Sequence, residues 1–426
     1  MENRSTLAYM PGAWDCGAAL LLSTCLLFSH FSFGQMPVDS LHIRYQLVKE
    51  EDNVIQNASA LDEVFESLFQ QLMLNDRIIN IVHIGDSHIQ ADYLTATVRR
   101  HIQKQFGNAG RGLVVPYAVA GTNGPFNIVS RSAIKWNVKR CVSADNPLPV
   151  GIGGITIQTD NDSADLELHM NDLWMDYTFN TVSLFFLKDR HSFDFLISDT
   201  VGTALATIDG SAEEVFRSHL RIVLPRPVAS IRLQAIQNRK EQDHATIFGL
   251  NLENGNNGIL YHAIGVNGAK YEHYNAASLF FTQTAALEPK LFIISLGTNE
   301  AVSYPYLDRI FSARIEEFVS ALRTINPQAK FLLITPPGAF RQKNRNNPGV
   351  AAIRKHLVDY AVENGLAFYD MYKAGGGDKS AEAWRDSALL RSDGIHFTKE
   401  GYEYQGNLFF HALMKAYNTY VLLRHP

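Results

Sequence analysis

The sequence predicts an α/β protein whose parallel sheet is interrupted by an inserted all-β domain. Strand-like and helical stretches alternate before about residue 120 and again after about residue 257, which predicts a parallel sheet with helices on both faces. Between these stretches, residues 121–256 hold short alternating runs separated by turn residues, a pattern typical of an antiparallel sandwich or jelly roll. The chain has 426 residues, enough for a large core and more than one domain.

The first unit of the sheet is centred on an apolar run at residues 78–85 that leads into Asp-Ser-His. A run of this kind is typical of a parallel strand that is buried on both faces. The spacing of apolar residues predicts a helix over 61–74 before the strand and another over 93–106 after it. The glycine-rich segment 107–112 is expected to be a loop, either a helix C-cap with a turn or the edge of a pocket.

The second stretch brings the predicted sheet to about five strands. Further strand-like runs lie at 259–264, 290–296, 330–335 and 366–371. Helical stretches are expected around 272–286, 306–325 and 350–364, with a final helix over about 399–417.

The inserted segment is predicted to be all-β, with strands at 154–158, 164–169, 181–187, 192–197 and 230–235. A loop that returns close to its starting point tolerates an insertion of this size. Because large aromatic side chains are mostly buried, Trp136, Trp174 and Trp384 are expected in the core rather than as platforms for a sugar.

The N-terminus contains an apolar segment at residues 17–33 that is short for a membrane span. It is interpreted as a secretory signal peptide, with cleavage between Gly34 and Gln35. The alternative is an uncleaved anchor, since Arg4 is the only cation before the apolar run and the n-region is not clearly positive.

Cysteine content and charge limit the compartment and the partners. Cys16 and Cys25 fall in the leader, so the mature chain would keep only Cys141, with no internal disulfide and no cysteine-based metal site. Export without disulfides suits a bacterial periplasm or cell surface, with no stable membrane partner once the signal is removed. A net charge of -5 and the lack of any basic run argue against a nucleic-acid partner.

Four segments next to predicted strands or helices carry residues that an acyl-transfer enzyme needs. A serine hydroxyl is a poor nucleophile until a base removes its proton, and Ser87 and His396 are the candidate pair. Asp393 precedes His396 by three residues on a turn and is the candidate to hold the imidazole in the correct tautomer. The N–H groups of Ser87 and Gly268 and the amide of Asn299 are candidate donors to a developing oxyanion.

Each of these pieces has a structural alternative. The Gly-Asp-Ser turn can simply cap a helix, and Asp-x-x-His is usually a solvated turn. Their joint occurrence, in order and beside predicted strand or helix ends, favours the catalytic interpretation. His88 and Arg111 are candidate substrate contacts, with a helix cap and a turn as the respective alternatives. No zinc-protease or dinucleotide motif is present, and the expected reaction needs neither metal nor cofactor.

The combined motifs resemble the SGNH (GDSL-type) hydrolase superfamily over roughly 78–118 and 258–417. The matching blocks are Gly85-Asp86-Ser87, Gly268, Gly297-Thr298-Asn299 and Asp393-Gly394-Ile395-His396. The resemblance implies a flavodoxin-like three-layer α/β/α core, a Ser-His-Asp triad and the three oxyanion donors named above. Two positions depart from the common pattern without removing a catalytic group: His88 stands for a leucine and Glu300 for an aspartate.

A narrower resemblance rests on residues 85–95 and 106–113 together with the β-rich insertion. These features are similar to bacterial peptidoglycan O-acetylesterases, which carry a carbohydrate-binding-like jelly roll within the SGNH core. The resemblance implies a periplasmic serine esterase that removes acetyl groups from the muramic-acid O6 position through an acetyl-serine intermediate. The expected organisation is a signal peptide at 1–34, the two core parts at 61–120 and 257–420, and the inserted domain at 121–256.

Two kinds of alternative remain open at this point. One keeps the mechanism and changes the substrate to xylan, sialate or another polysaccharide, or to a lipid, although no long apolar lid favours a lipid. The other is a glycan-binding surface protein with an inert core, against which the joint presence of Ser87, Asp393 and His396 argues.

Overall fold

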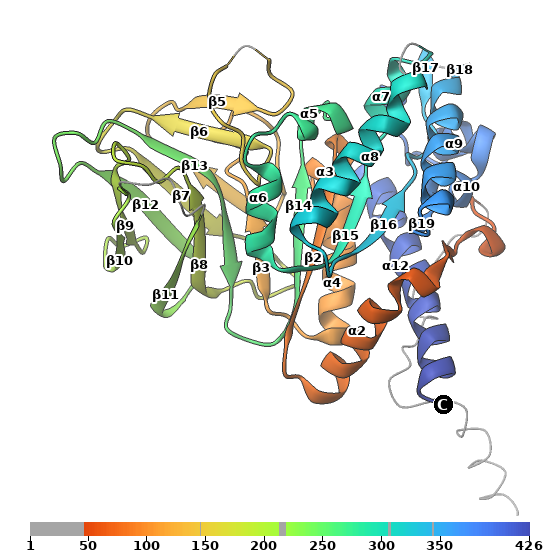
Figure 1. Ribbon diagram of the computed structural model, residues 1–426, viewed down its shortest axis with the longest axis horizontal. Coiled ribbons are helices and arrows are strands. Elements are labelled where there is room, and N and C mark those ends of the chain that lie inside the picture. Colours follow the sequence, from red (N-terminus) through yellow and green to blue (C-terminus); the bar gives the residue numbers. More distant parts are fainter. Residues whose placement is uncertain (1–46, 145, 213–218, 306–307, 343–344) are drawn as a thin grey trace, which may run out of the picture.

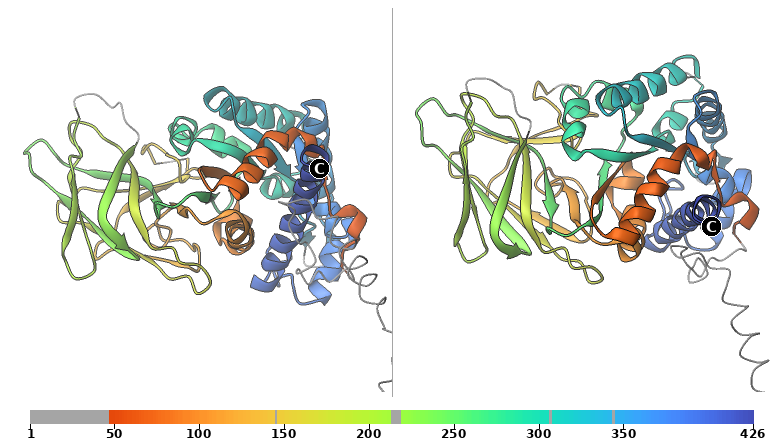
Figure 2. Two further views of the ribbon diagram at one scale, coloured as in Figure 1. Left: turned by 90° about the horizontal axis from the view of Figure 1, so that it is seen from below. Right: turned by 60° about the horizontal axis from the view of Figure 1, so that its bottom comes forward.

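The protein consists of an α/β unit beside a β-sandwich (Figure 1). This fold comes from a computed structural model, and the structure describes residues 47–144, 146–212, 219–305, 308–342 and 345–426. The expected signal peptide at 1–34 lies outside the described residues. Two further views show the same side-by-side arrangement (Figure 2).

The central sheet of the α/β unit has the order β1-β19-β16-β15-β2-β14. Its parallel strands are β2 (Ile78–Gly85), β14 (Gly258–Gly265), β15 (Pro289–Ser295), β16 (Lys330–Ile334) and β19 (Ala367–Tyr369), and β1 (Ile55–Gln56) adds an antiparallel edge. Numbered along the chain, the five parallel strands lie in the order 2-1-3-4-5, which is the flavodoxin-like order. The predicted fold class, an α/β core with an all-β insertion, is therefore confirmed.

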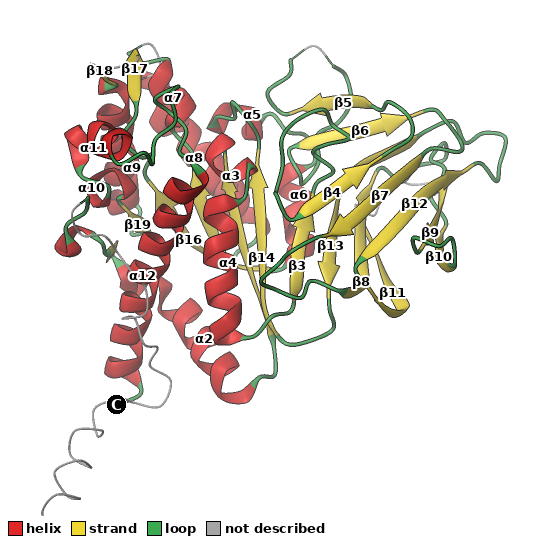
Figure 3. Ribbon diagram, turned by 180° about the vertical axis from the view of Figure 1, so that it is seen from behind, coloured by secondary structure: helices red, strands yellow, loops and turns green. Residues whose placement is uncertain are grey.

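Helices lie on both sides of this sheet (Figure 3). The α-helices are α2 (Asp62–Leu74), α3 (Ser87–Gln90), α4 (Tyr93–Phe106), α5 (Tyr271–Asn275), α6 (Phe280–Thr284), α7 (Thr298–Val302), α8 (Asp308–Ile325), α9 (Pro348–Glu363), α10 (Met371–Ala374), α11 (Ser380–Asp386) and α12 (Lys399–Arg424). Short 3-10 helices are η1 (Glu50–Asp52), η2 (Ala58–Leu61), η3 (Ala285–Leu287) and η4 (Gly377–Lys379). Within the described residues, none of these helices combines the length and apolarity needed to cross a membrane.

The stretch around 272–286 is helical as expected, but the chain is broken there into α5, α6 and η3. The N–H of Leu279 donates to the carbonyl of Val150 in the sandwich at 3.0 Å, which draws the backbone out of a continuous helix. The last helix, in contrast, runs seven residues beyond the expected end at Tyr417, to Arg424.

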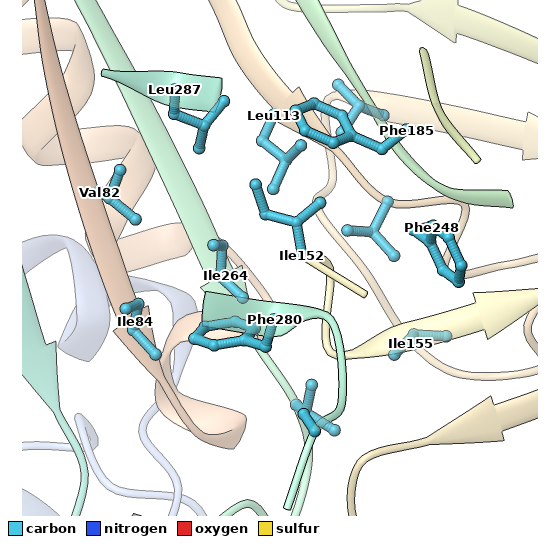
Figure 4. Packing of buried hydrophobic residues seen from close by; sticks show 14 of the residues in the cluster. Val82, Ile84, Leu113, Ile152, Ile155, Phe185, Phe248, Ile264, Phe280 and Leu287 are labelled. Carbon is cyan, nitrogen blue, oxygen red and sulfur yellow. The ribbon is translucent and has the colours of Figure 1, made fainter. Parts of the chain in front are cut away.

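Strand β2 is buried on both faces, as its apolar sequence predicts. Ile79 and Ile81 belong to the core beneath α2, α4 and α12. Val82 and Ile84 belong to a second core that continues into the sandwich (Figure 4). Because one continuous core joins the two units, the insertion is packed against the sheet rather than tethered to it.

The sandwich consists of two antiparallel sheets. One has the order β10 (Ala204–Ile208), β9 (Asp194–Ser198), β12 (Ser230–Ile236), β7 (Asp165–Met170) and β4 (Ile128–Arg131). The other has the order β11 (His219–Val228), β8 (Phe179–Phe186), β13 (Ala245–Glu253), β6 (Ile155–Thr159) and β5 (Asn137–Arg140). A separate hairpin is formed by β17 (Phe340–Gln342) and β18 (Arg345–Asn346).

The glycine-rich segment 107–112 is only partly a loop, because strand β3 (Gly110–Val114) begins within it and pairs with β13. A Cβ on Gly110 would lie 2.5 Å from the carbonyl oxygen of Leu252, so glycine permits the close approach of the two backbones. Pairing with a strand about 140 residues away is a tertiary contact that local sequence does not reveal.

Candidate active site

Ser87 lies on a sharp turn between β2 and α3. Gly85 ends the strand, and a Cβ there would lie 2.3 Å from the side chain of Ile89 and 2.8 Å from the carbonyl of Ser295. Asp86 then caps α3, accepting a hydrogen bond from the N–H of His88 at 3.0 Å. The capping role considered for this turn is therefore real, and Asp86 performs it while the neighbouring Ser87 faces a cleft.

His396 is within hydrogen-bond distance of the candidate nucleophile. The distance from its Nε2 to Ser87 Oγ is 2.9 Å, and its Nδ1 lies 3.0 Å from Asp393 Oδ2. The other carboxylate oxygen of Asp393 accepts the N–H groups of Ile395 and His396 at 2.9 and 2.8 Å. The three side chains therefore form a continuous relay of the kind that can take a proton from a serine hydroxyl.

The pKa of Asp393 lies below its ordinary value. Burial alone raises this pKa, but the hydrogen bonds from the N–H groups of His396 and Ile395 and from the His396 ring outweigh it. Asp393 therefore stays ionised and can orient the imidazole and stabilise its protonated form.

Three neighbouring strands bring the remaining predicted residues to the same place. In the sheet register, Gly85 of β2 pairs with Gly265 of β14 on one side and with Ser295 of β15 on the other. The strands thus end level, and the loop after β14 and the start of α7 after β15 place Gly268 and Asn299 in the cleft with Ser87. Ligands of open α/β sheets bind at this position, outside the carboxyl ends of the strands where the order reverses.

Gly268 and Asn299 occupy positions with specific local requirements. Gly268 has a φ of 82°, which favours glycine, and a Cβ there would meet no atom within 4 Å. The side-chain amide of Asn299 donates to the carbonyl of Ala269 at 2.9 Å and approaches Asp86 at 3.5 Å. These contacts fix Asn299 at the edge of the cleft, close to the turn that carries Ser87.

Two carboxyl groups are buried behind the cleft. Burial raises the pKa of Asp86 to about 6, although the His88 N–H and the Thr298 hydroxyl donate to it. Burial also raises the pKa of Glu300 to about 7, against the hydrogen bond that its Oε1 accepts from the Tyr271 N–H at 2.9 Å. Glu300 therefore joins α7 to α5, and with them the segments that carry Asn299 and Gly268.

The cleft has a volume of about 790 Å³, and its lining mixes polar and apolar surface. Around the triad it presents amide and hydroxyl groups, two cations and aromatic rings, from Tyr93, Asn123, Asn267, Thr298, Arg391, Lys399 and Tyr402. A larger groove, of about 920 Å³, lies between α2 and the end of α12 and contains none of the predicted site residues. In the part of the chain that the structure describes, no cluster of three His, Cys, Asp or Glu side chains is arranged to hold a metal.

Two predicted substrate contacts do not lie in the cleft. His88 is buried behind His396, with its ring centroid 5.5 Å from that of His396 and its Nδ1 2.9 Å from the Tyr402 hydroxyl. Burial lowers the pKa of His88 to about 3, so the ring is neutral and adds no charge beside His396. Arg111 is 1% exposed and bonded to Asp92, because an unpaired guanidinium would be too costly to bury.

The prediction that all three tryptophans lie in the core is wrong for one of them. Trp136 and Trp384 are buried as expected, but Trp174 is 46% exposed, on the loop between β7 and β8. Trp174 and Phe126 continue the aromatic lining of the cleft, and Lys399 and Arg391 supply its cations. In the sequence, only Lys399 stands close to a predicted catalytic residue, three positions after His396; Phe126 and Trp174 are far from any of them.

Comparison with known proteins finds a partial family match and a similar solved structure. Residues 238–404 match the sequence model of the GDSL-like Lipase/Acylhydrolase family, a span that contains Gly268, Asn299, Asp393 and His396 but begins after Ser87. No functionally curated protein matches the chain. The solved structure titled "Peptidoglycan O-acetylesterase in action, 5 min" is similar to it, with a TM-score of 0.71, 22% identity, and coverage of 86% of this chain and 99% of that one.

Two carbohydrate esterases show weaker similarity. A family two carbohydrate esterase from Clostridium thermocellum has a TM-score of 0.27 and 10% identity, covering 68% of this chain and 98% of that one. Its counterpart from Cellvibrio japonicus has a TM-score of 0.29 and 10% identity, covering 68% and 99%. With the family match and the shared fold, this chain carries a GDSL-like acylhydrolase domain on an SGNH-hydrolase fold and is a carboxylic ester hydrolase.

Proposed function

We propose that the protein is an exported O-acetylesterase that removes acetyl groups from peptidoglycan, the glycan of the bacterial cell wall. The observation that carries the proposal is the relay Ser87–His396–Asp393, with distances of 2.9 and 3.0 Å, in the lining of the cleft. The amide, hydroxyl and charged groups in the lining support a glycan rather than a lipid, because a lipid chain would leave them without partners. The similarity to a structure titled as a peptidoglycan O-acetylesterase directs the choice among glycans.

In the proposed reaction, Ser87 Oγ attacks the acetyl carbonyl carbon while His396 Nε2 takes the hydroxyl proton. The negative charge on the carbonyl oxygen is held by the N–H groups of Ser87 and Gly268 and by the Asn299 amide. The tetrahedral intermediate collapses as His396 returns its proton to the sugar oxygen, which leaves an acetyl-serine. Water deprotonated by His396 then attacks the acetyl group and releases acetate and free Ser87.

The test measures acetate release from O-acetylated peptidoglycan, from acetylated xylan and from a small aryl acetate. We expect release from peptidoglycan by the wild-type protein and none by Ser87→Ala. Ser312→Ala, an exposed serine on α8, is the matched control and should behave as wild type. Release from xylan or the aryl acetate alone would keep the esterase mechanism and refute the peptidoglycan assignment. No release from any substrate by folded protein would favour a glycan-binding protein instead.

Export is part of the proposal and has its own test. We propose that residues 1–34 direct the chain out of the cytoplasm and that the mature protein acts in the periplasm or at the cell surface, with residues 121–256 as its carbohydrate-binding-like insertion. N-terminal sequencing of protein from a native host should then begin at Gln35. A chain that still begins at Met1 would instead indicate an uncleaved anchor.

A further inference from the structure

Four side chains from separate parts of the chain form a continuous surface that leads out of the cleft. Tyr93 begins α4 and its ring stacks on Phe126, with centroids 5.2 Å apart and planes at 7°. Phe126 meets Trp174 edge to face, with centroids 6.1 Å apart. Lys399, the first residue of α12, holds its Nζ 6.0 Å from the centre of the Phe126 ring and 5.6 Å from that of Trp174. We call these four residues the aromatic–lysine wall.

The wall joins the α/β unit to the sandwich at the mouth of the cleft. Tyr93 and Lys399 line the cleft itself, while Phe126 and Trp174 come from the sandwich segments before β4 and between β7 and β8. Tyr93 also stacks on Tyr402, another lining residue, with centroids 6.5 Å apart. The wall therefore continues from the site of Ser87 toward the inserted unit.

A chain of hydrogen bonds and one ion pair holds the wall in position. Asp172 Oδ1 accepts the N–H groups of Trp174 and Met175 at 2.9 and 3.0 Å, and its Oδ2 accepts the Asn127 amide at 2.7 Å. Asn127 is next to Phe126, and its Oδ1 lies 3.4 Å from Arg111 Nη2. Arg111 is in turn bonded to Asp92, the residue before Tyr93. One polar network thus fixes three of the four wall residues.

An exposed tryptophan in such a supported position is unusual for a residue without a ligand. Trp174 is 46% exposed although its loop is anchored by four hydrogen bonds: the three to Asp172 and one from the Asn171 N–H to the Asn127 carbonyl at 2.9 Å. A rigid aromatic surface loses little conformational entropy when it binds a partner, and the apolar C–H faces of sugar rings pack well on such surfaces.

The charges beside the wall favour an anionic partner. Of the residues that line the cleft, all within the described chain, Arg391 and Lys399 are cationic and Asp393 is the only carboxylate. Asp393 is occupied by His396, and Arg100 adds a guanidinium 5.2 Å from the centre of the Trp174 ring. Glu403 Oε1 forms a loose ion pair with Lys399 Nζ at 3.9 Å, beyond hydrogen-bond distance, so the ammonium keeps its donors for a ligand.

We infer that the aromatic–lysine wall is a subsite for a carboxylate-bearing stretch of the glycan, beside the position where the acetyl group reaches Ser87. This inference rests on the proposed glycan esterase function and adds the side chains that recognise an anionic glycan. The rings of Trp174 and Phe126 contact the apolar part of the sugar, and Lys399 donates to its carboxylate. A neutral polymer such as xylan would use the rings without the ammonium.

The kinetic test compares two variants with matched neighbours. Trp174→Ala is paired with Leu173→Ala, whose side chain is 83% exposed on the same loop. Lys399→Gln is paired with Lys415→Gln on the same helix, far from the cleft. Each protein is assayed on O-acetylated peptidoglycan, acetylated xylan and the aryl acetate. The kcat/KM for each glycan is divided by the kcat/KM for the aryl acetate, so that a change in glycan recognition is separated from a change in the chemical step.

For Trp174→Ala we expect the ratio of kcat/KM for peptidoglycan to that for the aryl acetate to fall roughly tenfold, mainly through KM. For Lys399→Gln we expect a roughly fivefold fall on peptidoglycan at low salt that shrinks as salt is added, and no corresponding fall on xylan. The two control variants should match wild type. Unchanged ratios for Trp174→Ala would overturn the subsite, and equal losses on both glycans for Lys399→Gln would overturn the carboxylate contact.

A binding measurement separates failure of the subsite from failure of the proposed function. Ser87→Ala protein is titrated with soluble peptidoglycan fragments that lack acetyl groups, with the fluorescence of exposed Trp174 as the readout. We expect a saturable change that is weakened in Ser87→Ala/Lys399→Gln, which keeps the Trp174 reporter. Binding without any turnover by the wild-type protein would refute the esterase proposal and keep the subsite, whereas turnover without this binding would refute the subsite alone.

Discussion

Arg111 Nη2 lies 2.6 Å from Asp92 Oδ2, and both side chains are 1% exposed. Arg99 donates to the same carboxylate from two nitrogens: Nη2 lies 2.8 Å from Oδ1 and Nη1 lies 3.0 Å from Oδ2. Burial alone raises the pKa of Asp92, but the two guanidinium groups outweigh it and the pKa falls below its ordinary value. A residue whose position in a glycine-rich segment made it a candidate substrate contact is therefore part of the frame that supports the cleft.

Replacement of Arg111 by methionine should lower the stability of the protein and should not remove a direct contact with the substrate. Loss of one cation from a buried cluster typically costs about 3 kcal/mol in the free energy of unfolding. Urea denaturation measures this cost, and Lys104→Met, at an exposed site on α4, is the control. Unchanged stability together with a raised KM would instead restore Arg111 as a substrate contact.

Asp393→Asn should lower kcat while the protein stays folded. The variant keeps an oxygen for the N–H groups of Ile395 and His396, but its amide favours the wrong tautomer of the imidazole. We expect a loss of roughly 10²- to 10⁴-fold in kcat on the aryl acetate. Steady-state kinetics with a thermal melt as control measures it, and wild-type turnover would show that Asp393 does not orient the base.

Asn299→Ala should act on the transition state more than on the bound substrate. The amide is proposed to meet the oxyanion only as charge develops, so we expect kcat to fall roughly 10²- to 10³-fold with little change in KM. Asn299 also bonds the carbonyl of Ala269, which gives it a structural role. A rise in KM together with a lower melting temperature, and no separate loss in kcat, would identify that structural role as its only one.

Glu300→Gln should make the protein more stable at alkaline pH. Burial raises the pKa of Glu300 from 4.5 to about 7, so the folded protein holds a proton that the unfolded chain has lost between those two values. Stability therefore falls as pH rises through this window, by on the order of 3 kcal/mol in all. Glutamine keeps the acceptor for the Tyr271 N–H and has no proton to lose.

Urea denaturation of both proteins at pH 4.5 and pH 8 isolates this effect. The two stabilities should be similar at the lower pH, and the variant should be the more stable at the higher pH. Asp86, whose pKa burial also raises, is present in both proteins, so most of its contribution is common to the two pH dependences. Parallel pH dependences would show that Glu300 is already ionised in the folded state.

Much of the site was readable from the sequence because its residues lie close to local landmarks. Ser87, Gly268 and Asn299 each follow an apolar run, and the carboxyl ends of parallel strands meet at one edge of a sheet. Asp393 and His396 are three residues apart on one turn, so a short-range hydrogen bond can join them. These inferences need only the period of the apolar pattern and the direction of each strand.

The features that the sequence did not reveal depend on contacts between distant parts of the chain. Arg111 enters the interior because Asp92 is there, β3 forms because β13 lies beside it, and the helix over 272–286 breaks where Leu279 meets Val150. Trp174 stays exposed because a network through Asp172 holds its loop beside Lys399, more than 200 residues away. Residue type and periodicity determined which strands and catalytic candidates exist, whereas burial, ion pairing and the wall beside the cleft were decided only by the three-dimensional packing that brings distant side chains together.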